Sequence, residues 1–95
     1  MNPVDIDDRY DSFIVTMTIP KVKEKDILIF GEGTTLRVIA TSKKTEVNLE
    51  GQSVDVKVDS AYFDRTVILP SEADFSRIRY TYFGGLLEII VAKSN

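Results

Sequence analysis

Hydrophobic and polar residues alternate along most of this chain with a period of two, which is typical of half-buried β-strands. The clearest cases are Phe13–Ile19 and Ser53–Asp59, and in the second Val54, Val56 and Val58 share one face while charged residues take the other. No amphipathic stripe of about ten or more residues with helical spacing is present. The pattern therefore predicts a fold dominated by antiparallel strands.

Five further runs predict strands: Asp26–Phe30, Leu36–Ala40, Phe63–Leu69, Ile78–Phe83 and Leu86–Ala92. The stretch GEGTT and the pair Gly84-Gly85 predict tight connections between antiparallel neighbours. Residues 41–52 are polar and mixed, so we expect a long loop there with a short strand at Glu46–Leu49. The stretch SEADFS is expected to be a polar crossing. Together these elements predict one domain over residues 1–95, an antiparallel immunoglobulin-like β-sandwich of about seven to nine short strands.

Composition excludes most kinds of catalytic and metal site. The 95 residues include no histidine and no cysteine, which removes the commonest general base, the commonest metal ligand and both Ser-His and Cys-His arrangements. Asp5, Asp7 and Asp8 lie near the N-terminus without apolar surroundings, so a hydrated acidic surface is expected rather than a site. We expect no enzyme, no cofactor and no bound metal.

The charge balance argues against nucleic acid as a partner. The net charge is −3, and the denser basic spots, Lys21 to Lys25 and Lys43-Lys44, have acidic neighbours. Tyr80 and Tyr82 share a face with Ile78 and could stack on bases, but a core or groove wall suits this charge balance better. The acidic N-terminus and the lack of a long apolar run predict neither signal peptide nor membrane span, hence a cytoplasmic protein.

One stretch carries a sharper signal than composition. The run FDRTVILP places Phe63, Arg65, Leu69 and Pro70 in the pattern F-x-R-x-x-x-L-P, which resembles the signature of the α-crystallin domain of small heat-shock proteins. The following run GLLEI, which begins at Gly85 and includes Leu87, resembles the closing strand of that family. Upstream, the family's opening is matched by Pro3 followed by Asp5-Ile6, by a strand ending at Pro20, and by Asp26-Ile27. The resemblance spans nearly the whole chain.

The chain departs from the family pattern at several positions. Lys21 stands where a glycine usually follows the proline, Tyr80 stands in place of a small alanine, and Gly84 replaces a polar residue. Tyr80 would change the shape of any groove that it lines. The long N-terminal arm and the C-terminal I-x-I extension of the family are not matched, so large shells are not expected.

The resemblance implies an ATP-independent holdase, a chaperone that binds unfolding client proteins and keeps them from aggregating. It also implies a groove for I-x-I segments between two strands, lined by Ile27, Ile29, Ile78, Tyr80 and Tyr82. Leu28 and Phe30 point to the opposite face, where two readings compete: a patch for clients or partners, slightly favoured, or a surface covered by a dimer mate.

The long interval between Leu36 and Phe63 resembles bacterial, archaeal and plant members, in which a loop strand is swapped onto the partner subunit. The resemblance therefore implies a homodimer in which Glu46, Val47, Asn48 and Leu49 pair with the edge strand of the partner. That edge is expected at residues 4–7, with Val4, Asp5 and Ile6.

The charged entrance of the signature strand has an expected role as well. Phe63 should anchor the sandwich, and Arg65 should project on the same side, near the dimer seam, and pair with a carboxylate. Asp64 is expected to face water. Pro70 ends the strand because the chain leaves that sheet.

Two other functions remain open at this point. One is a co-chaperone adaptor of the CS-domain type, although those domains lack the F-x-R-x-x-x-L-P run. The other is a protein-interaction module of a larger protein that contains a small-heat-shock-like domain.

Overall fold

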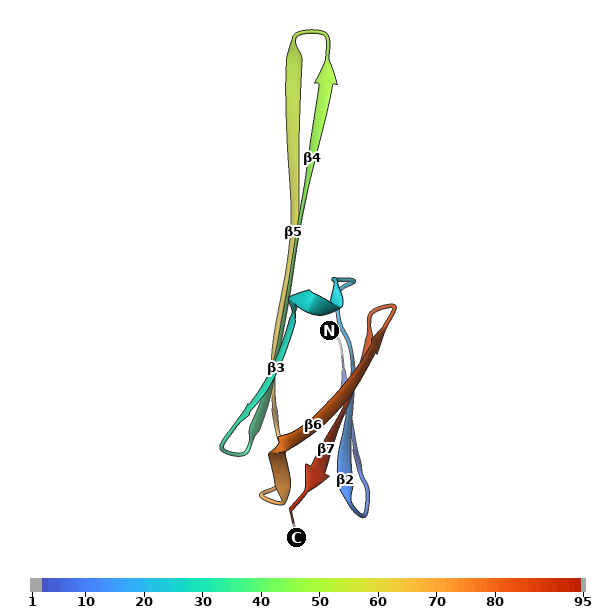
Figure 1. Cartoon of the computed structure of the whole chain (residues 1–95), viewed down its shortest axis with the longest axis vertical. Helices are drawn as coiled ribbons and strands as arrows, with labels where there is room; N and C mark the ends of the chain where they lie inside the picture. Colours follow the sequence, from blue (N-terminus) through green and yellow to red (C-terminus); the bar gives the residue numbers. More distant parts are fainter. Residues whose placement is uncertain (1–2, 95) are drawn as a thin grey trace.

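The computed structural model of the chain describes residues 3–94, and within this range it contains seven strands and one turn of 3-10 helix (Figure 1). The elements are β1 (Val4–Asp8), β2 (Ser12–Thr18), η1 (Glu24–Asp26), β3 (Ile27–Glu32), β4 (Thr35–Glu50), β5 (Ser53–Ile68), β6 (Ala73–Phe83) and β7 (Leu86–Lys93). The predicted all-β class is confirmed.

The strands form two antiparallel sheets that face each other. Sheet A has the order β1-β2-β7-β6, and sheet B has the order β3-β4-β5. Figure 1 shows β3 and the lower parts of β4 and β5 on one side of the body, with β2, β6 and β7 on the other. This arrangement is the predicted sandwich.

The core lies between the sheets because the alternating pattern sends every second side chain inward. Buried residues come from the central strands β2, β4 and β7, from β5 and from the chain just after β2 and β5: Phe13, Val15, Met17 and Ile19, then Leu36, Val38 and Ala40, then Val67 and Leu69, then Leu87, Ile89 and Val91. Leu69 and Leu87 of the sequence signature are therefore core residues.

Tight glycine turns join the strands as expected. Gly84 and Gly85 connect β6 to β7 with φ of 59° and 91°, values that favour glycine. A Cβ at Gly85 would also approach the carbonyl oxygen of Ile19, whose own N–H donates to the Gly85 carbonyl at 2.7 Å. The turn is thus held against the end of β2.

The long loop predicted at residues 41–52 is wrong. β4 continues without a break to Glu50, a two-residue turn at Gly51-Gln52 follows, and β5 returns from Ser53. The two strands pair in register from Thr35↔Ile68 to Glu50↔Ser53. The polar residues of 41–50 form a strand because a well-patterned partner strand lies beside them.

Other predicted boundaries also change. The strands expected at Ser53–Asp59 and Phe63–Leu69 are one strand, β5, so the elements are not all short. The polar crossing expected in SEADFS is partly strand, since β6 begins at Ala73 and a bulge separates Ala73 from Ile78. Asp26 belongs to η1 rather than to β3.

The extended hairpin gives the molecule its elongated shape. The principal extents are 66 × 22 × 21 Å, and the radius of gyration is 17.5 Å. A compact domain of this length would have a radius of gyration of about 12 Å. The outer part of the hairpin, residues 41–62, therefore projects from the sandwich, and we call it the arm (Figure 1).

Candidate functional site: the arm and the open edges of the sandwich

The arm has one apolar side and one polar side. Directly opposed residues of an antiparallel pair project to the same face, and the register places Val47 opposite Val56 and Leu49 opposite Val54. These four side chains, with Val58, form what we call the apolar side of the arm. The predicted shared face of Val54, Val56 and Val58 is confirmed. All five are 53–75% exposed, so nothing in the single chain covers them.

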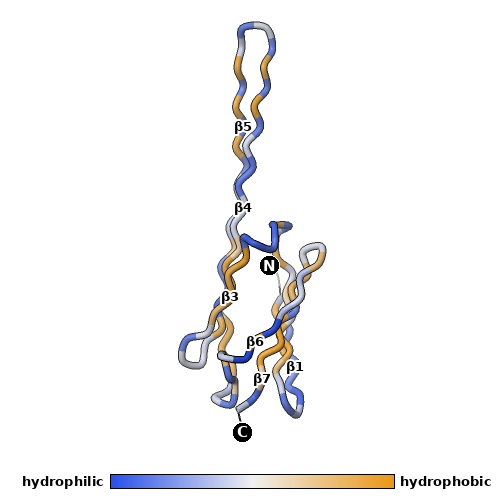
Figure 2. The backbone as a smooth tube through the Cα atoms, viewed as in Figure 1, coloured by the Kyte–Doolittle hydropathy of each residue, from blue (hydrophilic) through white to orange (hydrophobic). Residues whose placement is uncertain are grey.

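The polar side explains why the ribbon forms despite its exposure. Glu46 lies opposite Lys57, and Lys44 lies opposite Asp59, so opposite charges face each other across the two strands. Figure 2 shows the resulting alternation of hydrophobic and hydrophilic residues along both strands of the arm. An isolated two-stranded ribbon is nevertheless only marginally stable in water. The arm is therefore a surface that gains stability when it is covered.

The outer part of β4 and the strand β1 each have a strand partner on one side only. β3 pairs with β4 only as far as Ala40, so the outer part of β4 has a partner on one side alone. β1 is the edge of sheet A and pairs only with β2. Ile6 of β1 lies opposite the buried Val15 and so faces inward, yet it is 43% exposed. Sheet B does not extend over this corner of sheet A.

Within the chain, the predicted swap strand has a different partner. Glu46, Val47, Asn48 and Leu49 pair with residues 54–57 of β5 rather than standing alone. The predicted edge at Val4, Asp5 and Ile6 is part of β1. The structure does not bring these two segments together in one chain.

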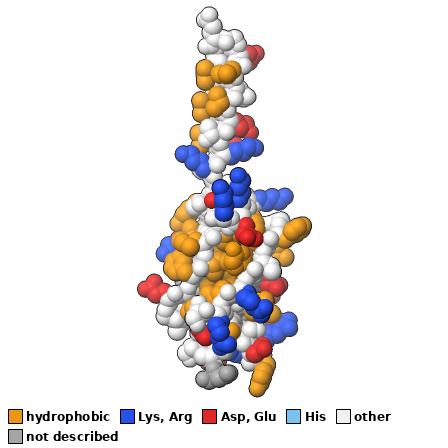
Figure 3. Space-filling view, in the orientation of Figure 1, with side chains coloured by type: hydrophobic (Ala, Val, Ile, Leu, Met, Phe, Trp, Pro, Cys, Tyr) orange, Lys and Arg blue, Asp and Glu red, His pale blue; other side chains and the backbone are white. Residues whose placement is uncertain are grey.

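The five residues predicted for the groove lie where the two sheets meet at their open side. β3 and β6 are edge strands of opposite sheets and approach each other there. Ile27 and Ile29 face inward from β3, since they lie opposite the buried Ala40 and Val38. Figure 3 shows hydrophobic side chains gathered in the middle of the body, where Figure 1 draws this seam.

From β6, the side chains of Ile78, Tyr80 and Tyr82 face the same interior, opposite the buried Val91, Ile89 and Leu87. Ile78 and Tyr82 pack against the core, but Tyr80 is 42% exposed although it faces inward. The seam is therefore open to solvent at Tyr80.

Side chains hold both ends of the seam. The hydroxyl of Tyr82 donates to the carbonyl of Val22 at 3.0 Å and accepts from the Val22 N–H at 3.1 Å. These bonds fix the segment between β2 and β3 onto β6. At Gly31 an added Cβ would overlap the Phe75 ring, so Phe75 packs directly on the backbone of β3. Sequence reasoning missed both contacts because they join residues far apart in the chain.

The outer face of sheet B carries the predicted patch. Leu28 is 56% exposed and Phe30 is half-buried, and their cross-strand neighbours are Ile39 and Arg37. The prediction that both residues point away from the seam is confirmed by this register.

An ion pair lies beside this patch. Arg37 donates to Asp64 through Nε at 2.9 Å and Nη2 at 2.6 Å, and the hydroxyl of Tyr62 donates to the same carboxylate at 3.2 Å. The hydrogen bond from Arg37 lowers the pKa of Asp64 below its ordinary value. Asp64 lies on the surface as expected, but it is paired rather than simply hydrated. The register sets Arg37 opposite Thr66 and Ile39 opposite Asp64, so Arg37 and Asp64 are diagonal neighbours on the same face.

The remaining signature residues lie as expected. Phe63 is half-buried and packs against the core. Arg65 projects to the same side, opposite the buried Val38, and is half-buried. The pairing of Arg65 with a carboxylate stays a prediction. Pro70 follows the end of β5, where the chain turns toward sheet A.

Metal binding and membrane insertion were also considered for the described part of the chain. No group of three or more acidic residues within residues 3–94 is arranged to hold a metal ion. None of the helical structure in the same range could cross a membrane.

The sequence and the fold were compared with those of known proteins. A sequence profile of the Hsp20/alpha crystallin family matches residues 5–95. No curated protein matches the sequence. Among solved structures, a small heat-shock protein from Xylella fastidiosa has a TM-score of 0.72 at 22% identity, with 100% of this chain and 87% of that chain covered.

Two further structures are similar. Heat shock protein 16.0 from Schizosaccharomyces pombe has a TM-score of 0.69 at 20% identity and covers 97% of this chain and 86% of its own. The hspA protein from Xanthomonas axonopodis has a TM-score of 0.71 at 19% identity, with 97% and 92% covered. At these identities the structural likeness concerns the fold.

Proposed function

The chain belongs to the Hsp20/alpha crystallin family, a family of chaperones rather than enzymes, and we propose on that basis that it is an ATP-independent holdase that acts as a homodimer. The observation that carries the proposal is the arm, whose five large apolar side chains are more than half exposed in the single chain. Such a surface on a soluble domain marks an interaction site.

The dimer is proposed to form by contact of each arm with the edge of sheet A in the other copy. The outer part of β4 offers free backbone groups along residues 46–49, and β1 offers them along residues 4–7. Val47 and Leu49 would then cover Ile6 of the other copy, which the single chain leaves 43% exposed. A two-fold axis makes this contact twice. Arg65 is proposed to lie near this interface between the two copies.

Client binding is proposed at the seam between β3 and β6 and at the patch of Leu28 and Phe30. The seam combines inward-facing apolar side chains with two strand edges, which suits an extended apolar segment of an unfolding protein. Leu28, at 56% exposure, adds apolar surface on the outer face. Between the two readings of this patch, contact with clients is the proposed one. The expected cytoplasmic location stays a prediction.

An aggregation assay tests the holdase activity. A heat-labile client is warmed with and without the protein, in the absence of ATP, and light scattering is followed. Suppression at a near-stoichiometric ratio is expected. Leu28→Lys should weaken the suppression, whereas Lys25→Glu, an exposed charge change on η1, serves as the control. No suppression by the folded wild-type protein would contradict the holdase proposal and favour an adaptor that docks on one specific partner.

A further inference from the structure

The outer face of sheet A carries a charge pattern that the proposed dimer contact leaves exposed, since that contact uses the backbone edge of β1 and the inward-facing Ile6. One row of side chains crosses all four strands in the order Asp7, Ile14, Ile90 and Arg79, since the register pairs each with the next. Directly opposed residues project to the same face, and neighbouring strands lie about 4.8 Å apart, so the row is roughly 15 Å long. The row thus has an acidic side chain at one end, two isoleucines in the middle and a basic side chain at the other end.

The two charged ends of this row keep binding capacity. Among the ion pairs and hydrogen bonds of residues 3–94, none involves the Arg79 guanidinium. Asp7 accepts a bond from Arg9 through Oδ2 at 2.8 Å, and its Oδ1 accepts no side-chain bond in that range. Both the Asp7 and the Arg9 side chains are about half exposed, so this local pair is weak.

We propose that this face binds the same face of a second copy through a two-fold axis parallel to the strands. That axis reverses the order of the row, so Asp7 of each copy meets Arg79 of the other and Ile14 meets Ile90. Two sheets pack face to face at about 10 Å, a gap that an arginine and an aspartate reaching from opposite sides can bridge. The row is therefore self-complementary in both charge and hydrophobicity.

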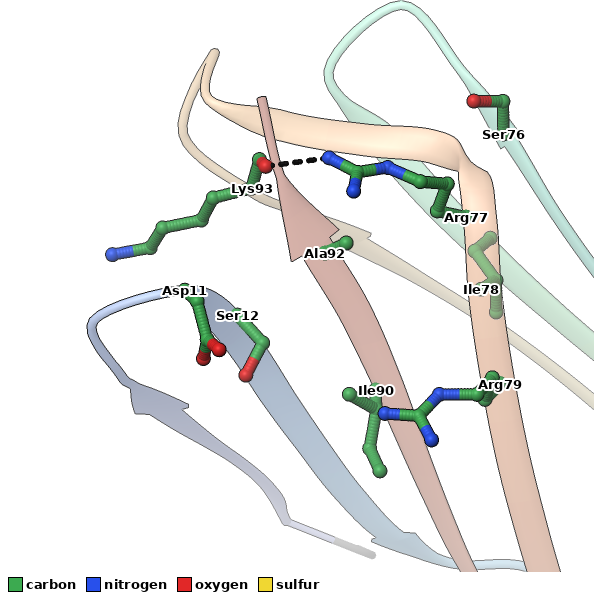
Figure 4. A pocket seen from close by; sticks show the side chains of 9 residues that line it. All are labelled: Asp11, Ser12, Ser76, Arg77, Ile78, Arg79, Ile90, Ala92 and Lys93. Carbon is green, nitrogen blue, oxygen red and sulfur yellow. Dashed lines mark hydrogen bonds between the residues drawn. The ribbon is translucent and has the colours of Figure 1, made fainter. Parts of the chain in front are cut away.

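A hollow on the same face supports the same axis. It has a volume of about 510 Å³, and Figure 4 shows Arg77, Arg79, Ile90 and Ala92 around it, with Asp11 on the far side. Arg77 is already engaged, since it donates to Asp74 and to the Lys93 carbonyl. Arg79 is the basic side chain of the hollow that remains available.

The turn between β1 and β2 fits this hollow in the second copy. Tyr10 in that turn is fully exposed, so its ring packs against none of the described residues. The turn lies at the same end of sheet A as the hollow, which Asp11 and Ser12 help to line. Because the two-fold axis exchanges the β1 side with the β6 side, it sets Tyr10 of each copy over the hollow of the other. There the ring would lie against Ile90 and a guanidinium.

The contact is small and independent of the arm. Four strands at the usual spacing present on the order of 400 Å² per copy, about half of a standard protein interface. We therefore expect weak association, which becomes stronger when arm-linked dimers present two such faces each. Assembly would then rise with concentration beyond the dimer.

Charge reversal tests the proposal. Sedimentation is measured over a concentration series for the wild type, for Arg79→Asp, for Asp7→Arg and for the double variant. Each single variant sets like charges opposite each other and should lower the association constant at least about tenfold. The double variant restores the pairing and should return the constant to within about threefold of the wild type. Lys25→Glu makes the same change in charge as Arg79→Asp on the exposed turn η1, outside sheet A, and should change nothing.

A variant that lacks the arm contact allows the sheet A contact to be measured alone. With Val56→Lys, which disables the apolar side of the arm, the sheet A contact should remain as a monomer–dimer equilibrium. In this background Tyr10→Ser should weaken it, although Tyr10 contributes no contact to the fold. A Val56→Lys protein that stays monomeric at every concentration, or single charge reversals without effect, would overturn the proposal. A wild type that never dimerises through the arm, but still responds to Arg79→Asp, would overturn only the dimer proposal.

Discussion

Replacing Val56 by lysine should split the proposed dimer while leaving the sandwich folded. Val56 lies at the middle of the apolar side of the arm, opposite Val47, and 62% of its surface is exposed in the single chain. Because Val56 is exposed and is not part of the buried core, the substitution removes no core contact. Any large effect must then arise from a surface that a second copy covers.

The expected size follows from the area that remains to be buried. Full burial of a valine side chain contributes about 1.5–3 kcal/mol, so covering the exposed part of Val56 contributes roughly 1–2 kcal/mol per copy. A two-fold dimer contains two such residues, and their loss raises Kd roughly 30- to 700-fold at about 1.4 kcal/mol per factor of ten. Desolvation of the lysine ammonium adds to this loss.

Analytical ultracentrifugation over a dilution series measures Kd, and circular dichroism checks that the β-structure is retained. Ser53→Lys is the matched control, because it adds the same charge to the polar side of the arm, opposite Glu50. It should leave Kd within about threefold of the wild type. The reasoning is refuted if Val56→Lys dimerises as tightly as Ser53→Lys, because the apolar side would then stay in water in the dimer.

Three further predictions concern the sandwich itself. Leu87→Ala, at a fully buried position of the signature, should lower the free energy of unfolding by about 2–5 kcal/mol in urea titrations, and a loss below about 1 kcal/mol would show a core that closes the cavity. Tyr82→Phe should lower the free energy of unfolding by about 1–3 kcal/mol in the same titrations, because the N–H and the carbonyl of Val22 both lose their partner. Unchanged stability would mean that water replaces the hydroxyl. Asp74→Asn should lower the melting temperature at neutral pH. Hydrogen bonds from Ser76 and Arg77 lower the pKa of Asp74 to about 2 in the folded protein. The ionised carboxylate therefore stabilises the fold at every pH above the pKa that Asp74 has in the unfolded chain. This difference should shrink as pH falls toward 2, and a difference that persists there would contradict the assignment.

Local pattern was sufficient for most of the sandwich. The alternation in Phe13–Ile19 predicted a strand and its two faces, because burial of every second side chain is a property of the strand itself. Leu36–Ala40 and Leu86–Ala92 were likewise predicted as strands. The pair Gly84-Gly85 predicted its turn because both φ angles are positive there. Alternation also gave the shared face of Ile78, Tyr80 and Tyr82 and the opposite direction of Leu28 and Phe30. The groove between the two strands was implied only by the family resemblance.

Features that depend on pairing between distant segments could not be predicted from the sequence. Residues 41–50 look polar and irregular alone, and they become a strand because 53–62 lie beside them in register. The Arg37–Asp64 pair and the packing of Phe75 on Gly31 each join separate parts of the chain.

The amino-acid sequence by itself therefore determined which residues could share a face, which turns were possible and which family the chain resembles. Only the tertiary structure decided that the apolar residues of the hairpin project beyond the sandwich instead of entering its core. The physical reason is that a two-residue period specifies the faces of a strand but not what covers them, and coverage depends on how far the opposite sheet extends.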